Sequence, residues 1–189
     1  VLGRLDGYLY KSFESIDKVP VLTIDGRTWM SLTPMEIESH FLPIQKAQGN
    51  VGVAGLGFGY YIQEILQKDE VESVDVYEIN QDVIDMYIAN FGEYEKLNII
   101  KADVLEMKYK EYDFFYADIY PEQMDIKAIE HKSLLTHYNN IDEYFFWTQE
   151  AMVFTLLLGN RDTYGLSDFE VREFISVLLR EKGNFLVDT

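Results

Sequence analysis

Residues 51–59 read VGVAGLGFG, in which a short apolar run leads directly into a loop with glycine at every second position. Ile62, Ile65 and Leu66 follow at helical spacing, so a helix is expected just after the loop. Glycines let the backbone approach a ligand closely, and the unpaired amides that begin a helix face that ligand. The stretch therefore predicts a strand, loop and helix that bind a nucleotide-like cofactor.

The segment after this loop alternates between strand-like and helix-like patterns. We expect strands over residues 73–79, 97–101 and 113–118, and a helix that contains Val83 and ends at Gly92. This order predicts an α/β fold with a Rossmann-like, mostly parallel sheet and helices on both faces.

Two β-rich runs, residues 19–24 and 27–32, flank Asp25-Gly26 and predict a β-hairpin before the sheet, since both turn positions favour positive φ. A helix is expected over residues 33–42, and Pro43 is expected to bend or end it. We expect this hairpin and helix (residues 1–49) and a cofactor-binding domain (residues 50–189) to form one compact unit.

The alternation stops after Pro121, and the remainder of the chain is predicted to be mostly helical. Residues 142–158 read as one buried helix, and a last helix is expected after Ser167. Only residues 184–188 read as a late strand. The aromatic-rich C-terminal helices are a candidate surface for a homodimer.

The composition excludes several kinds of protein. The 189 residues include 33 acidic and 16 basic ones, which give a net charge of −17, and no cysteine. An acidic chain lacks the basic footprint of a nucleic-acid partner, and the absence of cysteine excludes disulfides and thiolate zinc sites. No apolar run is long enough to cross a membrane and no leader is visible, so we expect a cytoplasmic protein without a membrane partner.

Residues 51–120 are the most acidic segment, with 15 acidic and 5 basic residues. This excess is interpreted as a solubilising surface, or alternatively as attraction of a cationic substrate. His40, His131 and His137 are interpreted as packing or surface residues, because their spacing does not suggest a metal site.

An acidic residue, Glu78, ends the second predicted strand, where a carboxylate can accept both hydroxyls of a ribose. The sixth position of the loop is Tyr60 instead of the glycine that favours pyrophosphate binding. A Gly-x-Gly-x-Gly loop, an acid that ends strand two and another, Asp103, after strand three resemble the class I S-adenosylmethionine-dependent methyltransferases. Glu78 as a solvated strand end and Asp103 as a turn cap remain alternatives.

The resemblance implies that the glycines line the methionine and ribose part of S-adenosylmethionine, that Glu78 holds the ribose, and that Asp103 reaches the adenine, with Val104 against its ring. The residues assigned to cofactor binding are Gly55, Gly57, Phe58, Gly59, Glu78, Ile79, Asp103 and Val104.

Asp118 and Tyr120 follow the fourth predicted strand, where the family keeps its substrate-side residues, and are the candidate catalytic residues. Asp118 would orient a small-molecule acceptor or take its proton, and Tyr120 and Tyr60 would shape the substrate pocket. The expected activity is methyl transfer to a small, possibly cationic, molecule.

The layout upstream of the loop is similar to the spermidine synthase branch of the same superfamily. Val53 stands where many methyltransferases have an acid, and the hairpin and helix precede the loop as in that branch. An alternative activity is therefore aminopropyl transfer from decarboxylated S-adenosylmethionine. A third hypothesis is a non-catalytic binding or regulatory protein, because at most one strand is expected after Asp118.

Overall fold

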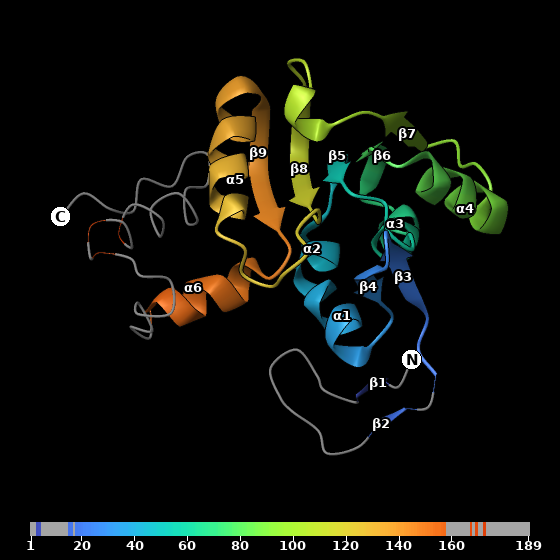
Figure 1. Cartoon of the computed structure of the whole chain (residues 1–189). Helices are drawn as coiled ribbons and strands as arrows, with labels where there is room; N and C mark the ends of the chain where they lie inside the picture. Colours follow the sequence, from blue (N-terminus) through green and yellow to red (C-terminus); the bar gives the residue numbers. More distant parts are fainter. Residues whose placement is uncertain are drawn as a thin grey trace.

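The computed structural model of the chain describes residues 3–4, 15–16, 18–157, 167, 169 and 172. A five-stranded parallel sheet is at its centre (Figure 1). The strands are β5 (Gly49–Ala54), β6 (Val71–Glu78), β7 (Leu97–Lys101), β8 (Glu111–Ala117) and β9 (Asn140–Phe146), and their order across the sheet is β7-β6-β5-β8-β9.

The strand order reverses between β5 and β8. From β5 the chain adds β6 and then β7 on one side, and it crosses back to add β8 and β9 on the other. In an open parallel sheet, loops at such a reversal diverge and leave a crevice outside the carboxyl ends of the strands. The order and direction of these strands confirm the expected Rossmann-like α/β fold.

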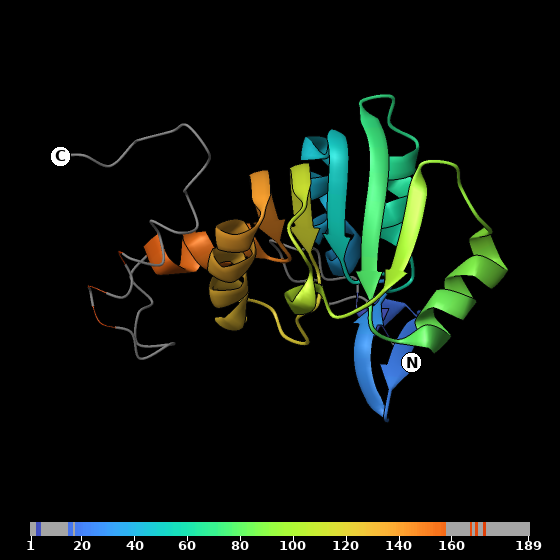
Figure 2. The same ribbon diagram turned by 90° about the horizontal axis from the view of Figure 1, so that it is seen from above.

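Helices cover both faces of the sheet, as the view from above in Figure 2 makes clear. On one face, α3 (Tyr60–Leu66) and α4 (Gln81–Phe91) pack on side chains that include Val53 and Val76. On the other face, α5 (Lys127–Tyr138) packs on side chains that include Phe115 and Tyr144. Successive residues of a strand point to opposite faces of the sheet. Phe114 therefore packs in the hydrophobic core beneath α3 and α4, and Phe115 packs in the core beneath α5.

An antiparallel hairpin, β3 (Val21–Ile24) and β4 (Arg27–Ser31), precedes the sheet as expected. Its turn residues, Asp25 and Gly26, have φ of 50° and 75°, which is the positive-φ geometry of a tight hairpin turn. Two short strands, β1 (Gly3–Arg4) and β2 (Ser15–Ile16), pair before it.

The helix begins as expected, with Thr33 as its cap and Pro34 as its first residue, but its predicted extent to residue 42 is wrong. The structure has two short helices, α1 (Pro34–Ser39) and α2 (Phe41–Lys46), which His40 separates. Pro43 does not end the second helix, because it is the third residue of α2, where no intrahelical partner for its nitrogen is required. The break places His40 at the junction of the two helices.

The prediction of one helix over residues 142–158 is also wrong. The first part of this stretch belongs to β9, which pairs in parallel with β8, and the helix α6 (Gln149–Leu157) begins only after Thr148, whose φ is 62°. The 3-10 helix η1 (Val104–Glu106) is a further short element. The helix expected after Ser167 falls on residues of which only two are described, and the strand expected over residues 184–188 lies outside the described residues.

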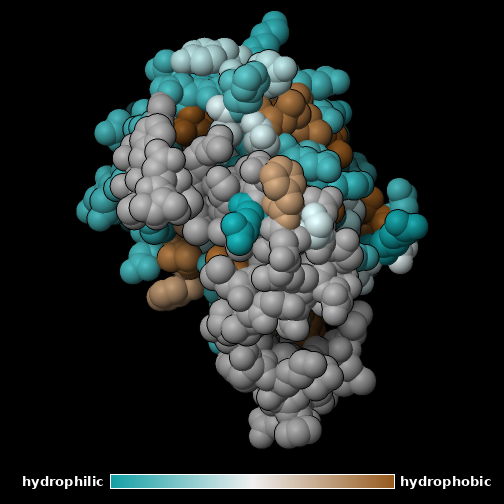
Figure 3. Space-filling view, turned by 90° about the vertical axis from the view of Figure 1, so that its left-hand side faces the viewer, coloured by the Kyte–Doolittle hydropathy of each residue, from teal (hydrophilic) through white to brown (hydrophobic). Residues whose placement is uncertain are grey.

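Hydrophilic side chains cover most of the coloured surface in Figure 3, with apolar side chains between them. Within the part of the chain that the structure describes, no helix combines the length and the apolar character needed to cross a bilayer.

Candidate functional site

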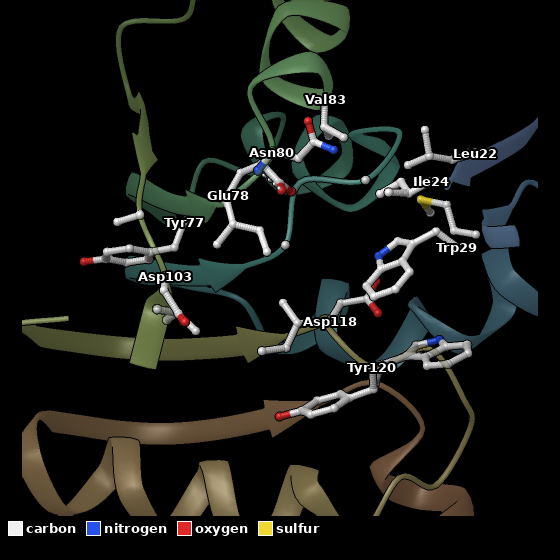
Figure 4. A pocket seen from close by; sticks show the side chains of 18 of the residues that line it. Leu22, Ile24, Trp29, Tyr77, Glu78, Asn80, Val83, Asp103, Asp118 and Tyr120 are labelled. Atoms are coloured by element: carbon white, nitrogen blue, oxygen red, sulfur yellow. Dashed lines mark hydrogen bonds between the residues drawn. The ribbon is translucent and has the colours of Figure 1, made fainter. Parts of the chain in front are cut away.

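A cavity of about 350 Å³ lies at the carboxyl ends of the strands, where the strand order reverses. Residues that follow β5, β6, β7 and β8 line it, and the hairpin closes it with Leu22, Ile24, Trp29 and Met30. In Figure 4, Glu78, Asp103 and Asp118 enter the same space from three different strand ends. The four parallel strands thus deliver their C-terminal residues to one site.

The glycine loop lies against the end of β8. Gly55 has φ of 94°, and a Cβ on it would lie 2.2 Å from the backbone oxygen of Asp118. Asp118 in turn donates its amide N–H to the Ala54 oxygen at 2.8 Å. Only glycine lets the two neighbouring loops approach this closely, so the loop after β5 fixes the position of Asp118.

The hairpin contacts the same loop through Met30. The Phe58 amide N–H donates to the Met30 Sδ at 3.1 Å, and a Cβ on Gly57 would lie 2.4 Å from that sulfur. Phe58 and Gly59 do not line the cavity, although the sequence assigned both to cofactor binding. Gly59 instead faces the ring of Tyr87, where a Cβ would lie 2.4 Å away.

Glu78 connects the ends of β5 and β6. Its Oε2 accepts the Leu56 N–H at 3.0 Å, and its Oε1 accepts the Asn80 N–H at 2.8 Å. A carboxylate has about four acceptor positions, so each oxygen keeps one for a ligand hydroxyl. Glu78 therefore shapes the glycine loop and also faces the cavity, and it is more than a solvated strand end.

Asp103 caps η1, which was the alternative to a ligand role. Its Oδ1 accepts the Leu105 N–H at 2.9 Å, whereas its Oδ2 has no partner among the described residues. Val104 is buried beneath the cavity, and Ile79, 69% exposed, lies at its edge. Ile79 and Val104 could therefore pack against a flat ring, and the second Asp103 oxygen could accept a hydrogen bond from it.

Asp118 and Tyr120, the candidate catalytic residues, both line the cavity. The Tyr120 ring packs on Phe146, and burial raises the pKa of its hydroxyl, so this phenol remains protonated near neutral pH. Tyr60, the other residue expected to shape the pocket, does not line it. Its ring lies edge-on to the ring of His40, with 5.9 Å between centroids.

His40 is the functional residue that the sequence did not reveal. Its side chain is 2% exposed, and its Nε2 lies 3.1 Å from the Asp118 Oδ2. Its Nδ1 lies 2.6 Å from the backbone oxygen of Glu36. The packing role expected for His40 is correct, but a contact between residues so far apart in sequence leaves no local pattern.

The two contacts determine where the protons of His40 lie. A carbonyl oxygen only accepts, so Nδ1 must carry a hydrogen that it donates to Glu36. The bond between Nε2 and Asp118 then requires one further proton, either on the ring or on the carboxyl group. Burial pushes the pKa of His40 down, but the hydrogen bond and the charge of Asp118 outweigh it, and the net shift is upward. The raised pKa favours a proton on the His40 ring in this pair.

Neighbouring hydrogen bonds hold this pair in place. The Ser39 hydroxyl donates to the Glu36 oxygen at 2.6 Å, and the Trp147 Nε1–H donates to the Ser39 Oγ at 2.8 Å. Trp147 follows β9 and itself lines the cavity, so the strand missed in the sequence also supports the site.

Among the described residues that line the cavity, four are acidic and none is Lys, Arg or His. The acidic residues are Glu36, Glu78, Asp103 and Asp118. His40 lies behind Asp118 and compensates that charge alone. The cavity is therefore suited to a ligand with positive charge.

No family model matches the sequence, and no curated protein matches it either. The parallel sheet, its strand order and the glycine loop after its first strand give the chain a Rossmann-like α/β fold, as expected.

Solved structures similar to this chain include spermidine synthase from Thermotoga maritima, with 20% identity over 66% of this chain and 47% of that chain, and a TM-score of 0.47. N-methyltransferase NodS from Bradyrhizobium japonicum WM9 has 13% identity over 76% of this chain and 82% of that chain, with a TM-score of 0.48. The ribosomal protein L11 methylase from Lactobacillus delbrueckii subsp. bulgaricus has 17% identity, coverages of 58% and 62%, and a TM-score of 0.46. The chain spans about half the length of the spermidine synthase.

Proposed function

We propose that this chain is an S-adenosylmethionine-dependent methyltransferase that acts on a small cationic molecule. The observation that carries the proposal is the convergence of four strand ends on one cavity. The glycine loop, Glu78, Asp103 and Asp118 come from consecutive strands of the sheet and line the same space.

The residues present fit the cofactor. Gly55 and Gly57 let it approach the backbone, and the free acceptor positions of Glu78 suit the ribose hydroxyls. Asp103 Oδ2 would accept the adenine amino group between Ile79 and Val104. When bound, the sulfonium cofactor supplies both the methyl group and its own leaving group. The protein's task is then to bind and align the acceptor.

The acceptor side of the site supports a cation as the substrate. Asp118 and Glu36 line the cavity together, and Trp29 and Tyr120 add aromatic surface that attracts positive charge. The protonated Tyr120 would act by packing or by donating a hydrogen bond, and Asp118 would orient the acceptor.

Calorimetric titration of the full chain with S-adenosylmethionine tests the proposal. Glu78→Ala is expected to weaken binding about 100-fold, because hydrogen bonds to a charged acceptor each contribute about 1.5–3 kcal/mol. Glu72→Ala, on the exposed face of the same strand, is the matched control and should bind normally. No binding by the intact chain, or equal binding by the Glu78 variant, would contradict the assignment.

The charge of the cavity favours a second candidate, aminopropyl transfer from decarboxylated S-adenosylmethionine. The carboxylate of the complete cofactor would find no basic side chain among the described residues that line the cavity. Titration with both cofactor forms separates the candidates. Tighter binding of the decarboxylated form supports aminopropyl transfer, and tighter binding of the carboxylated form removes it.

A further inference from the structure

Glu36 is a buried carboxylate that faces the cavity. It is 8% exposed and lies on α1, three residues after the helix cap Thr33. The cap hydroxyl accepts the Glu36 N–H at 3.4 Å, but within the described part of the chain the Glu36 carboxylate accepts no hydrogen bond in return. The usual capping role of a glutamate at this position is therefore not taken. The side chain lines the cavity instead.

Burial places the titration of Glu36 close to neutral pH. Burial, and secondarily the negative charge of Asp118, raise its pKa from 4.5 to about 7, while the charge of His40 lowers it. Asp118 lines the cavity from the end of β8, and His40 lies behind it at the junction of α1 and α2. Glu78 and Asp103 are the other charged residues that line the cavity. A proton acceptor works best when its pKa is near the working pH.

Asp118 is poorly placed to be that acceptor. Its Oδ2 already shares one proton with His40 Nε2, and His40 Nδ1 is committed to the Glu36 backbone oxygen. A further proton, taken up at the other Asp118 oxygen, would neutralise the carboxylate and leave a buried imidazolium without its counter-charge. The pair is therefore suited to holding a cation, and it does not readily take up another proton.

Resting on the proposed function, we propose that Glu36 takes the proton of an amine substrate, while the Asp118–His40 pair holds that amine in the cavity. The bound ammonium group gives one N–H proton to the ionised Glu36 carboxylate. The products of this step are a neutral carboxyl group and a neutral amine, whose lone pair is then free. The proton returns to water when Glu36 next ionises. The substrate class is thereby an amine whose protonated form carries an N–H hydrogen.

The proposal is tested by calorimetric binding of 1,4-diaminobutane to the full chain without cofactor. This probe remains doubly protonated between about pH 6 and about pH 8, because alkyl amines titrate near the lysine value of about 10.4. If the ionised form of Glu36 binds the probe, affinity should rise about tenfold over that interval. Glu36→Gln should remove the rise. Glu38→Gln, an exposed glutamate of the same helix, is the matched control and should keep it.

Two more variants separate the roles. Glu36→Asp keeps a carboxylate and should keep a rise with pH, which guards against a folding defect of the glutamine variant. Asp118→Asn should bind the probe more weakly, and its rise should move to lower pH because the charge of Asp118 raises the pKa of Glu36. The proposal is overturned by a wild-type chain that does not bind the diamine or shows no rise, or by a rise that persists in Glu36→Gln.

The cofactor titration on the same samples separates this inference from the proposed function. A chain that binds S-adenosylmethionine through Glu78 but shows no Glu36-dependent rise overturns the role of Glu36 alone. A chain that binds no cofactor overturns both.

Discussion

The His40 Nε2 lies 3.1 Å from the Asp118 Oδ2, and this contact joins the helix junction before the sheet to the end of its fourth strand in chain order. Asp118 is 24% exposed and His40 is 2% exposed, so the carboxylate faces the cavity and the ring is enclosed behind it. The contact fixes the direction of the candidate substrate-binding carboxylate.

Asp118→Asn should lower the pKa of His40. The neutral amide can still donate to Nε2, so the hydrogen bond is retained in reverse and the fold is kept. The variant loses the charge of Asp118, which opposes the effect of burial on the ring, while the contacts with Glu36 remain. NMR titration of the His40 Cε1–H resonance measures the change, with His131 and His137 as internal references. An unchanged midpoint would show that Asp118 does not hold the proton on His40.

Glu36 should make the folded chain less stable as the pH rises. Its pKa is about 7 in the folded chain, against an ordinary value of 4.5 for the solvated side chain, so the folded state binds more protons between these values. The stabilisation that Glu36 contributes is fully present below about pH 4.5 and is lost as the pH rises through about 7. The raised pKa of His40 acts in the same direction, with stability present below 6.5 and lost as the pH rises through its folded value.

Urea unfolding at about pH 4.5 and about pH 8 measures this effect. Between these two pH values, the free energy of unfolding of the wild-type chain should fall by up to about 3 kcal/mol more than that of Glu36→Gln. One pKa unit corresponds to about 1.4 kcal/mol. Glu38→Gln should follow the wild type. Equal losses in wild type and Glu36→Gln would contradict a raised pKa.

Gly55→Ala should destabilise the chain more than Gly57→Ala, although both glycines have positive φ. The added methyl group at Gly55 meets the backbone oxygen of Asp118, which cannot move without displacing the end of β8. At Gly57 it meets the flexible Met30 thioether. Thermal unfolding should show a loss above about 2 kcal/mol for Gly55→Ala and near 1 kcal/mol for Gly57→Ala. The reverse order would contradict the close approach of the two loops.

Ser39→Ala should destabilise the chain by about 1–3 kcal/mol. The substitution leaves the Nε1–H of the buried Trp147 without its acceptor. Ser73→Ala, at an exposed hydroxyl on β6, is the control and should change stability by less than about 0.5 kcal/mol. Similar losses in the two variants would argue against a structural role for the Trp147 contact.

The sequence predicts the cofactor half of the fold because local patterns carry it. The apolar strand that leads into the loop of VGVAGLGFG, a helix ended by Gly92 and acids at strand ends are all features of neighbouring residues. The tight turn at Asp25-Gly26 is predicted for the same reason, because both positions favour positive φ.

The remaining elements depend on contacts that no local pattern contains. The aromatic residues of β9 lie on both faces of the sheet, so the strand lacks alternation and merges with the apolar residues of α6. Pro43 is compatible with helix only because α1 ends before it. His40 and Asp118 meet through the tertiary fold, and the raised pKa of Glu36 follows from burial, which no sequence spacing encodes.

A crystal structure of the chain with S-adenosylhomocysteine tests the central claim most directly. We predict that the ribose hydroxyls lie within hydrogen-bond distance of Glu78, that the adenine lies between Ile79 and Val104, and that the sulfur faces Asp118. A complex in which the nucleoside binds elsewhere, or in which Glu78 keeps only its two backbone partners, would contradict the cofactor site and the function proposed from it.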